Sequence, residues 1–145
     1  MEILNKKARF DYFIEDEIEC GIELLGSEVK SIREGSCNLK DSYALIRNNE
    51  VFVINMFIKK YSHTGAFAES ETRKRKLLLH KKEILKLKTK VEKDGYTLIP
   101  LKLYFSKSNK AKLLLGICKG KKSYDKRETI KERDLKRRIE REQKY

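Results

Sequence analysis

The sequence has no long apolar run, and the residues after Met1 include no apolar core of the kind that a secretion signal requires. A membrane-spanning helix needs roughly 20 consecutive apolar residues, and a signal peptide needs a shorter apolar stretch behind basic residues. The sequence therefore predicts neither feature, and we expect a cytoplasmic protein with no membrane partner. With 145 residues, the chain is long enough for one hydrophobic core and too short for two ordinary domains.

Cysteine and histidine are scarce, with three and two residues, and the cysteines are too widely spaced to form a CxxC pair. A structural zinc site requires cysteine or histidine ligands in paired spacings. We therefore predict no metal site and interpret Cys20, Cys37 and Cys118 as small hydrophobic core residues.

Recognisable catalytic motifs are also absent, because the sequence contains no GxSxG, HExxH or phosphate-binding glycine loop. Glu15, Glu17 and Glu19 cluster in the sequence, but their alternation places them on a solvated strand face. We predict that the protein is not an enzyme and needs no cofactor.

Positive charge is in excess. The sequence contains 35 Lys and Arg against 22 Asp and Glu, which gives a net charge of +13. Such an excess attracts polyanions, so nucleic acid is the leading candidate partner, and an ordinary charged surface is the alternative. An anionic membrane is less favoured, because the basic tail lacks the broad apolar face of an interfacial helix.

Alternating apolar residues indicate several strands. From Phe10 to Leu24 they occupy even positions, which predicts one strand with one buried face. The asparagines at 48–49 separate two β-rich runs and predict a tight hairpin. A second hairpin is predicted from the alternation at 99–105 and 111–117. Within it, Pro100 predicts an edge position or an irregular pairing, because proline donates no ladder hydrogen bond.

Helical patterns occupy two further segments of the body. Ser27 is a candidate N-cap for a short helix that Gly35 would end. A longer amphipathic helix is predicted between Leu77 and Lys93, with Gly95 as its left-handed C-terminal cap. Residues 61–76 show no sustained apolar period, and we interpret them as a basic loop.

Together these elements predict a mainly β fold, an oligonucleotide-binding-type antiparallel β-barrel of residues 1–118 with two or three helices and a basic C-terminal tail. Residues 119–145 carry 12 Lys or Arg against 6 Asp or Glu and few aliphatic side chains. We expect this tail to be disordered when free, whereas the capping-box pattern at 129–132 predicts a helix on a polyanion. An ordinary solvated tail is the alternative.

Basic residues lie beside possible base-contacting groups in two segments. Phosphates bind Lys and Arg, whereas unpaired bases stack on aromatic faces. We therefore predict nucleic-acid contacts from Arg73, Lys74, Arg75, Lys76 and His80 in the body, and from Lys119, Lys121, Lys122, Tyr124, Lys126 and Arg127 in the tail. Charge alone does not distinguish RNA from DNA.

Six blocks in order resemble the small protein B family of SsrA-binding proteins, from Asn5 to about Arg141. They are Asn5-Lys6-Lys7-Ala8, Gly26-Ser27-Glu28-Val29-Lys30-Ser31, Asn38-Leu39-Lys40-Asp41-Ser42-Tyr43, Arg75-Lys76-Leu77-Leu78-Leu79-His80, Leu101-Lys102-Leu103-Tyr104-Phe105 and Lys119-Gly120-Lys121-Lys122-Ser123-Tyr124-Asp125-Lys126-Arg127.

The resemblance implies a barrel that binds the tRNA-like domain of transfer-messenger RNA. It implies delivery of that RNA, alanine-charged and with elongation factor Tu, to ribosomes stalled without a stop codon. The protein would then be an adaptor without catalytic activity, and we expect a monomer. A general structured-RNA-binding or ribosome-associated protein is the alternative.

The predicted RNA-binding residues of the body are Lys7, Glu19, Lys30, Arg73, Lys74, Arg75, Lys76, Leu78 and His80. The resemblance implies Glu19, Leu78 and His80, which fall where family members contact or support that RNA. In the tail, the resemblance implies a segment that enters the messenger channel and decoding centre and becomes helical on the ribosome. Its residues are Lys119, Gly120, Lys121, Lys122, Tyr124, Asp125, Lys126 and Arg127.

Three of the body residues have competing interpretations. Glu19 cannot attract phosphate, so an RNA role must involve base edges or a neighbouring cation, and a solvated strand carboxylate is the alternative. Leu78 is compatible with core packing or with support of other residues. His80 is equally compatible with capping the helix that follows it.

Overall fold

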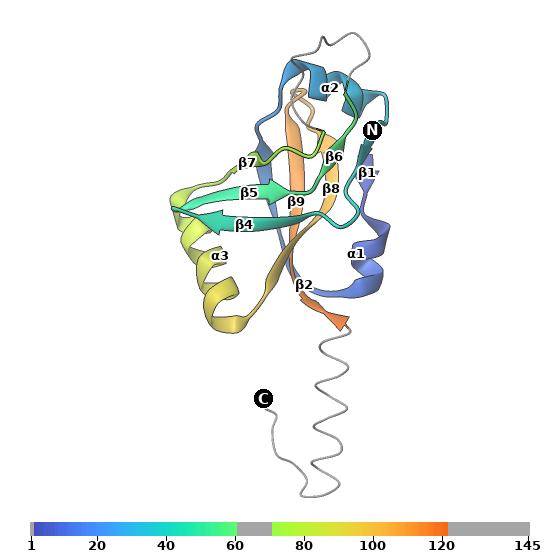
Figure 1. Cartoon of the computed structure of the whole chain (residues 1–145). Helices are drawn as coiled ribbons and strands as arrows, with labels where there is room; N and C mark the ends of the chain where they lie inside the picture. Colours follow the sequence, from blue (N-terminus) through green and yellow to red (C-terminus); the bar gives the residue numbers. More distant parts are fainter. Residues whose placement is uncertain (1, 61–70, 122–145) are drawn as a thin grey trace, which may run out of the picture.

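The computed structural model describes residues 2–60 and 71–121, which form nine strands and three helices (Figure 1). In chain order the elements are β1 (Glu2–Leu4), α1 (Lys6–Asp11), β2 (Tyr12–Ile22), α2 (Gly26–Arg33), β3 (Cys37–Asn38), β4 (Tyr43–Arg47), β5 (Glu50–Ile54), β6 (Phe57–Ile58), β7 (Arg75–Leu78), α3 (Lys81–Asp94), β8 (Thr97–Phe105) and β9 (Ala111–Gly120). No helix in these ranges is long and apolar enough to cross a membrane.

Six of the strands close into a ring. The order is β8-β4-β5-β7-β2-β9, and β9 pairs back onto β8. All of these pairings are antiparallel, and β1 adds to the outer edge of β8. The structure therefore confirms the predicted mainly β, antiparallel barrel.

Two apolar clusters hold the barrel together. The larger one includes Val51, Val53, Leu77 and Leu115, which are almost completely buried among the strands. The smaller one lies beneath α1, where Ala8 packs with residues of β8 and β9. Removal of apolar side chains from water is the main force that stabilises such a fold.

The cysteines take the structural place that the sequence predicts. Cys20 and Cys118 are buried, Cys37 is half-buried, and none forms a disulfide. Burial disfavours the charged thiolate and raises the pKa of each thiol to about 12.

Both predicted hairpins are present. Asn48 and Asn49 have positive φ angles of 52° and 61° between β4 and β5, as the tight turn requires. In the β8–β9 hairpin the register shifts between Pro100 and Lys102. This shift confirms the irregular pairing predicted from the proline.

The predicted strand from Phe10 to Leu24 begins too early. Asn5 caps α1 by accepting a hydrogen bond from the Ala8 amide (3.1 Å), and α1 extends through Phe10 to Asp11. Phe10 is 80% exposed on this helix rather than buried in a strand. A helix of only 6 residues is too short to give a clear apolar period.

A β-bulge also divides the apolar positions of β2 between two faces. Ile14 lies opposite Cys118, whereas Asp16 lies opposite Ile117, so Glu15 is an extra residue in the strand. Ile14 consequently packs in the cluster beneath α1, and Ile18 packs in the main core. The expectation of a single buried face is therefore wrong.

The helices start at different residues from those predicted. Leu25, not Ser27, is the N-cap of α2, and Glu28 accepts a hydrogen bond from the Leu25 amide (2.8 Å). Leu77 belongs to β7, and α3 starts only after His80. The predicted end of α3 is confirmed, since Gly95 has a φ angle of 72°.

Candidate nucleic-acid interface

The structure brings Glu19, Leu78 and His80 together at one pocket of about 300 Å³. Its other lining residues are Cys20, Gly21, Leu79, Glu83 and Lys112. Antiparallel pairing of β2 and β7 places Gly21 opposite Leu78, and β7 leads through Leu79 to His80 at the start of α3. Residues that are about 60 positions apart in the sequence thus line one pocket.

Gly21 makes room for Leu78 in this pocket. A Cβ atom at position 21 would lie 3.3 Å from both Cβ and Cδ1 of Leu78, which is tighter than ordinary packing. Leu78 therefore lies against the glycine of β2 and remains 47% exposed. An exposed leucine beside charged groups can pack against a ribose or the face of a base.

His80 occupies the N-cap position of α3 through its backbone. Its amide donates to the Glu83 carboxylate (2.8 Å), and its carbonyl accepts from the Ile84 amide (3.0 Å). The imidazole makes no capping hydrogen bond and is exposed. The ring is therefore available at the pocket while the backbone begins the helix.

Lys112 is a pocket residue that the sequence reasoning missed. It lies on β9 between Gly21 of β2 and Tyr104 of β8, both of which are its register partners. Its neighbour Leu113 points into the core, so Lys112 points outward. The alternation in the predicted second hairpin already indicates that Lys112 points outward. Only the strand order of the ring shows that Lys112 lines the same pocket as Glu19.

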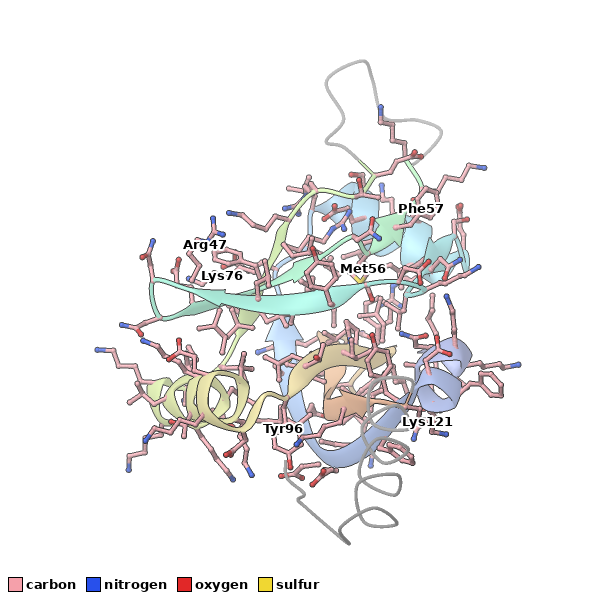
Figure 2. All side chains as sticks on the ribbon, turned by 60° about the horizontal axis from the view of Figure 1, so that its bottom comes forward. Arg47, Met56, Phe57, Lys76, Tyr96 and Lys121 are labelled. Atoms are coloured by element: carbon pink, nitrogen blue, oxygen red, sulfur yellow. The ribbon has the colours of Figure 1, made fainter. Side chains whose placement is uncertain are left out.

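The basic run at 73–76 is only partly the loop that was predicted, because Arg73 and Lys74 precede a strand that begins at Arg75. Residues 75–78 form β7, in which Arg75 and Leu77 point inward and are buried. Arg75 donates through Nε to Glu28 (2.8 Å) and through Nη1 to the carbonyl of Met56 (2.7 Å), a buried residue labelled in Figure 2. A completely buried guanidinium presents no surface to phosphate, so we leave Arg75 out of the proposed interface.

Arg73 shares the same carboxylate as Arg75. Its Nη2 lies 2.6 Å from Oε1 of Glu28. Burial by itself would raise the pKa of Glu28, but hydrogen bonds from Arg73, the Leu25 amide and Arg75, with the charge of Arg75, lower it below its ordinary value. The cluster thus stays ionised and joins α2 to β7.

The two lysines of this run also have partners at the surface. Lys74 lies over the Phe52 ring, 4.5 Å from its centroid. Lys76, labelled in Figure 2, lies 2.8 Å from Glu50. Both side chains can still turn toward a polyanion, because exposed pairs of this kind are weak.

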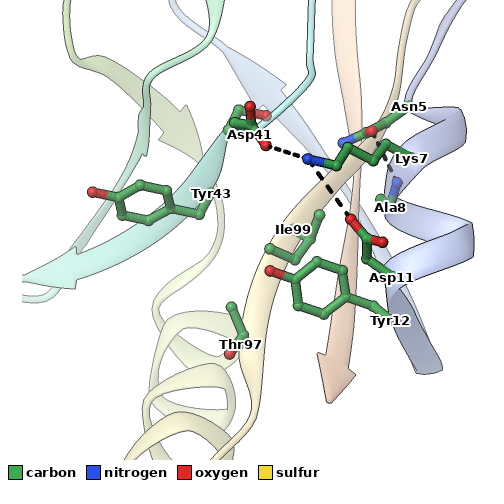
Figure 3. Close-up of a pocket in the computed structure, with 10 residues that line it drawn as sticks. Asn5, Lys7, Ala8, Asp11, Tyr12, Asp41, Tyr43, Thr97 and Ile99 are labelled. Carbon is green, nitrogen blue, oxygen red and sulfur yellow. Dashed lines mark hydrogen bonds and ion pairs between the residues drawn. The ribbon is translucent and has the colours of Figure 1, made fainter. Parts of the chain in front are cut away.

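Lys7 lies at a different pocket, which shares no lining residue with the first (Figure 3). Its amine is 3.1 Å from Asp41 and 3.9 Å from Asp11. The hydrogen bond and the charge of Asp41 raise the pKa of Lys7. Lys30 is exposed on α2 and does not line the Glu19 pocket. The predicted body residues therefore do not all line one pocket.

The start of the predicted tail belongs to the barrel. Lys119 and Gly120 are the last residues of β9 and pair with Phe13 and Tyr12. The Lys119 amine lies over the ring of Tyr96, which Figure 2 labels, at 4.8 Å from the centroid. Five other predicted tail residues lie outside the described residues: Lys122, Tyr124, Asp125, Lys126 and Arg127.

Lys121 is anchored just after the strand. Its amine donates to the carbonyl of Arg9 (3.4 Å) and lies 5.2 Å from the centre of the Phe13 ring. Among residues 2–60 and 71–121, no group of three or more His, Cys, Asp or Glu side chains could hold a metal ion.

Comparison with known proteins places the chain in a family. Residues 2–145 match the family model described as SmpB protein. The SsrA-binding protein of Clostridium tetani is 56% identical over 138 residues, which cover 95% of this chain and 88% of that protein. That of Staphylococcus aureus (strain Newman) is 52% identical over 140 residues, covering 97% and 90%.

The barrel also matches a solved structure described as "tmRNA-SmpB: a journey to the center of the bacterial ribosome". The TM-score is 0.70 with 43% sequence identity, over 83% of this chain and 84% of the other. The sequence match spans the barrel and the tail, and the structural match covers most of the chain. The chain therefore belongs to the SmpB family.

Proposed function

We propose that this chain is the RNA-binding adaptor of trans-translation. It binds the tRNA-like domain of transfer-messenger RNA and delivers that RNA to ribosomes stalled on messages without a stop codon. The observation that carries the proposal is membership of the SmpB family over nearly the whole chain. The solved relative that was described with tmRNA and the bacterial ribosome supports it.

Within this function, the Glu19 pocket is the proposed RNA contact of the body. Lys112 supplies a positive charge for phosphate, and the exposed His80 ring supplies a surface for a base. Leu78 adds an apolar contact in the same pocket. These side chains combine charge and stacking in the way that single-stranded or looped RNA requires.

The tail has a separate proposed role. Residues 119–127 enter the messenger channel and reach the decoding centre, where the tail is helical. Lys119 and Gly120 fix the start of this segment to the barrel through β9. The protein acts as a cytoplasmic monomer without catalysis, and it meets elongation factor Tu through the charged RNA.

A binding competition tests the body's role. The tRNA-like domain of transfer-messenger RNA and an ordinary tRNA compete for the full-length chain at several salt concentrations. We expect a clear preference for the former, and we expect log affinity to fall linearly with log salt. Equal affinities would favour a general structured-RNA-binding protein instead.

A matched pair of variants locates the interface in that assay. Lys112→Ala removes the cation of the pocket, whereas Lys107→Ala removes an exposed cation from the β8–β9 turn outside it. We expect Lys112→Ala to weaken binding and to reduce the salt slope by about one, because each phosphate contact contributes a slope of that order. Equal effects of the two variants would contradict a contact at this pocket.

A further inference from the structure

Tyr104 reaches Glu19 across an intervening strand. The phenol belongs to β8 and donates a hydrogen bond to the Glu19 carboxylate of β2, and β9 lies between the two strands (Figure 1). In the ladder, Tyr104 lies opposite Lys112 and Glu19 lies opposite Leu114. The ring therefore crosses the outer face of β9 and ends at the pocket that Glu19 lines.

The ring of Tyr104 also contacts a cation of its own strand. The Lys102 amine lies 5.0 Å from its centroid, and the same amine is 3.3 Å from the Glu2 carboxylate. A cation over an aromatic face is attracted by the ring. One chain of contacts thus runs from Glu2 through Lys102 and Tyr104 to Glu19.

A carboxylate in an RNA-binding pocket needs an explanation, because it repels phosphate. An ionised carboxylate is an acceptor only, with capacity for about four hydrogen bonds. The Tyr104 phenol uses part of that capacity and leaves the rest for a donor from outside. Exposed N–H groups on base edges, such as the cytosine amino group, are donors that a carboxylate accepts in nucleic-acid recognition.

We propose that Tyr104 is a positioning residue that orients Glu19 to accept a hydrogen bond from the N–H edge of an unpaired base in the bound RNA. The inference rests on the proposed function and names what Glu19 recognises there. Pre-organisation of the carboxylate lowers the entropy that binding would otherwise cost. Lys112, in the same pocket, can hold a phosphate close to the recognised base.

The experiment is a double-mutant cycle in the full-length chain, with the tRNA-like domain of transfer-messenger RNA as the probe. Tyr104→Phe removes only the phenol hydroxyl, and Glu19→Ala removes its acceptor. The matched control is Tyr96→Phe, because the Tyr96 hydroxyl donates to Glu15 (2.8 Å) outside the pocket. Thermal unfolding of each variant checks that it is folded.

We expect Tyr104→Phe to weaken RNA binding about two- to tenfold, because the Glu19 side chain is then no longer held in place and must be ordered when the RNA binds. The salt slope should stay unchanged, because no phosphate contact is lost. In the Glu19→Ala background the same change should have no effect, and Tyr96→Phe should bind as the wild type does. Such non-additivity is the signature of one residue that acts through the other.

Two results would overturn the inference. One is wild-type affinity for Tyr104→Phe, and the other is a full, additive loss of binding when Tyr104→Phe is combined with Glu19→Ala. Failure of the proposed function is a distinct outcome, in which the wild-type chain itself does not prefer the tRNA-like domain over ordinary tRNA.

Discussion

Arg75 and Glu28 form an ion pair inside the protein although they lie 47 residues apart in the sequence. Nη2 of Arg75 is 2.8 Å from Oε2 of Glu28, and the arginine side chain is completely buried. Arg73 donates to both oxygens of the same carboxylate. The pair joins α2 to β7. Arg73 and Arg75 therefore stabilise the fold of the body.

Replacement of Arg75 by Leu should lower the free energy of unfolding by about 3 kcal/mol. Removal of one partner leaves Glu28 buried with only Arg73 to balance its charge, and breaking a buried pair is strongly destabilising. Urea denaturation followed by circular dichroism measures the effect. The neighbouring variant Lys74→Leu is the control, and a loss below about 1 kcal/mol is expected there because Lys74 is exposed. Equal losses in both variants would contradict a special role for the buried pair.

The same carboxylate predicts a dependence of stability on pH. The pKa of Glu28 is lower in the folded chain than its ordinary value of 4.5. Folding therefore gains stability from this group above that value, and the gain is lost as pH falls through the folded-state pKa. The difference in unfolding free energy between the wild type and Glu28→Gln should be largest near neutral pH and shrink in acid. A difference that stayed constant down to pH 2 would argue against this assignment.

Gly116 should be intolerant of a side chain. A Cβ atom there would lie 2.8 Å from Cδ1 of Leu101 and 2.9 Å from Sγ of Cys118, in the cluster beneath α1. Gly116→Ala should destabilise the protein by about 1–3 kcal/mol through overpacking. Gly26→Ala is a matched control, because nothing lies within 4 Å of a Cβ at that helix start. Thermal melting of both variants distinguishes a packing effect from a general intolerance of alanine.

Removal of residues 122–145 should separate the two proposed activities. This cut keeps β9 complete and retains the contact of Lys121 with Arg9. Binding of the tRNA-like domain should change little, whereas peptide tagging on stalled ribosomes should be abolished. A truncated chain that tags normally, or one that loses RNA affinity as completely as the unfolded protein, would refute this division.

Much of the fold follows from local patterns in the sequence. The turn at Asn48 and Asn49, the irregular pairing at Pro100 and the end of α3 at Gly95 all depend on backbone preferences of single residues. Such preferences act within a few positions of the chain. They are therefore readable without knowledge of the tertiary structure.

The predictions from the sequence are wrong where tertiary contacts determine the local structure. No local pattern distinguishes an extra residue at Glu15, because only the pairing of β2 with β9 reveals it. Likewise, the sequence gives no sign that Arg73 and Arg75 are paired. Only the fold shows that Glu28 of α2 lies beside both. Charge in a sequence shows that a partner is needed, but not whether that partner belongs to the same chain.

The candidate site was predictable only in part. Glu19, Leu78 and His80 were identified through family resemblance, and the ring order explains why they meet at one pocket. Lys112 and Tyr104 could not be predicted as site residues, because their proximity to Glu19 depends on which strands are neighbours. The order of the strands, and not the distance along the sequence, determines which residues lie together at this pocket.

Strand β9 connects the two proposed working ends of the molecule. It carries Lys112 beside the pocket and ends at Gly120, where the tail segment begins. Pairing with β2 along this length keeps it extended, and eight steps of an extended chain span about 26 Å. The length of the strand thus sets the distance between the proposed RNA contact at Lys112 and the start of the tail after Gly120. A change in its length by two residues would preserve the inward and outward faces but move those two points apart by about 7 Å.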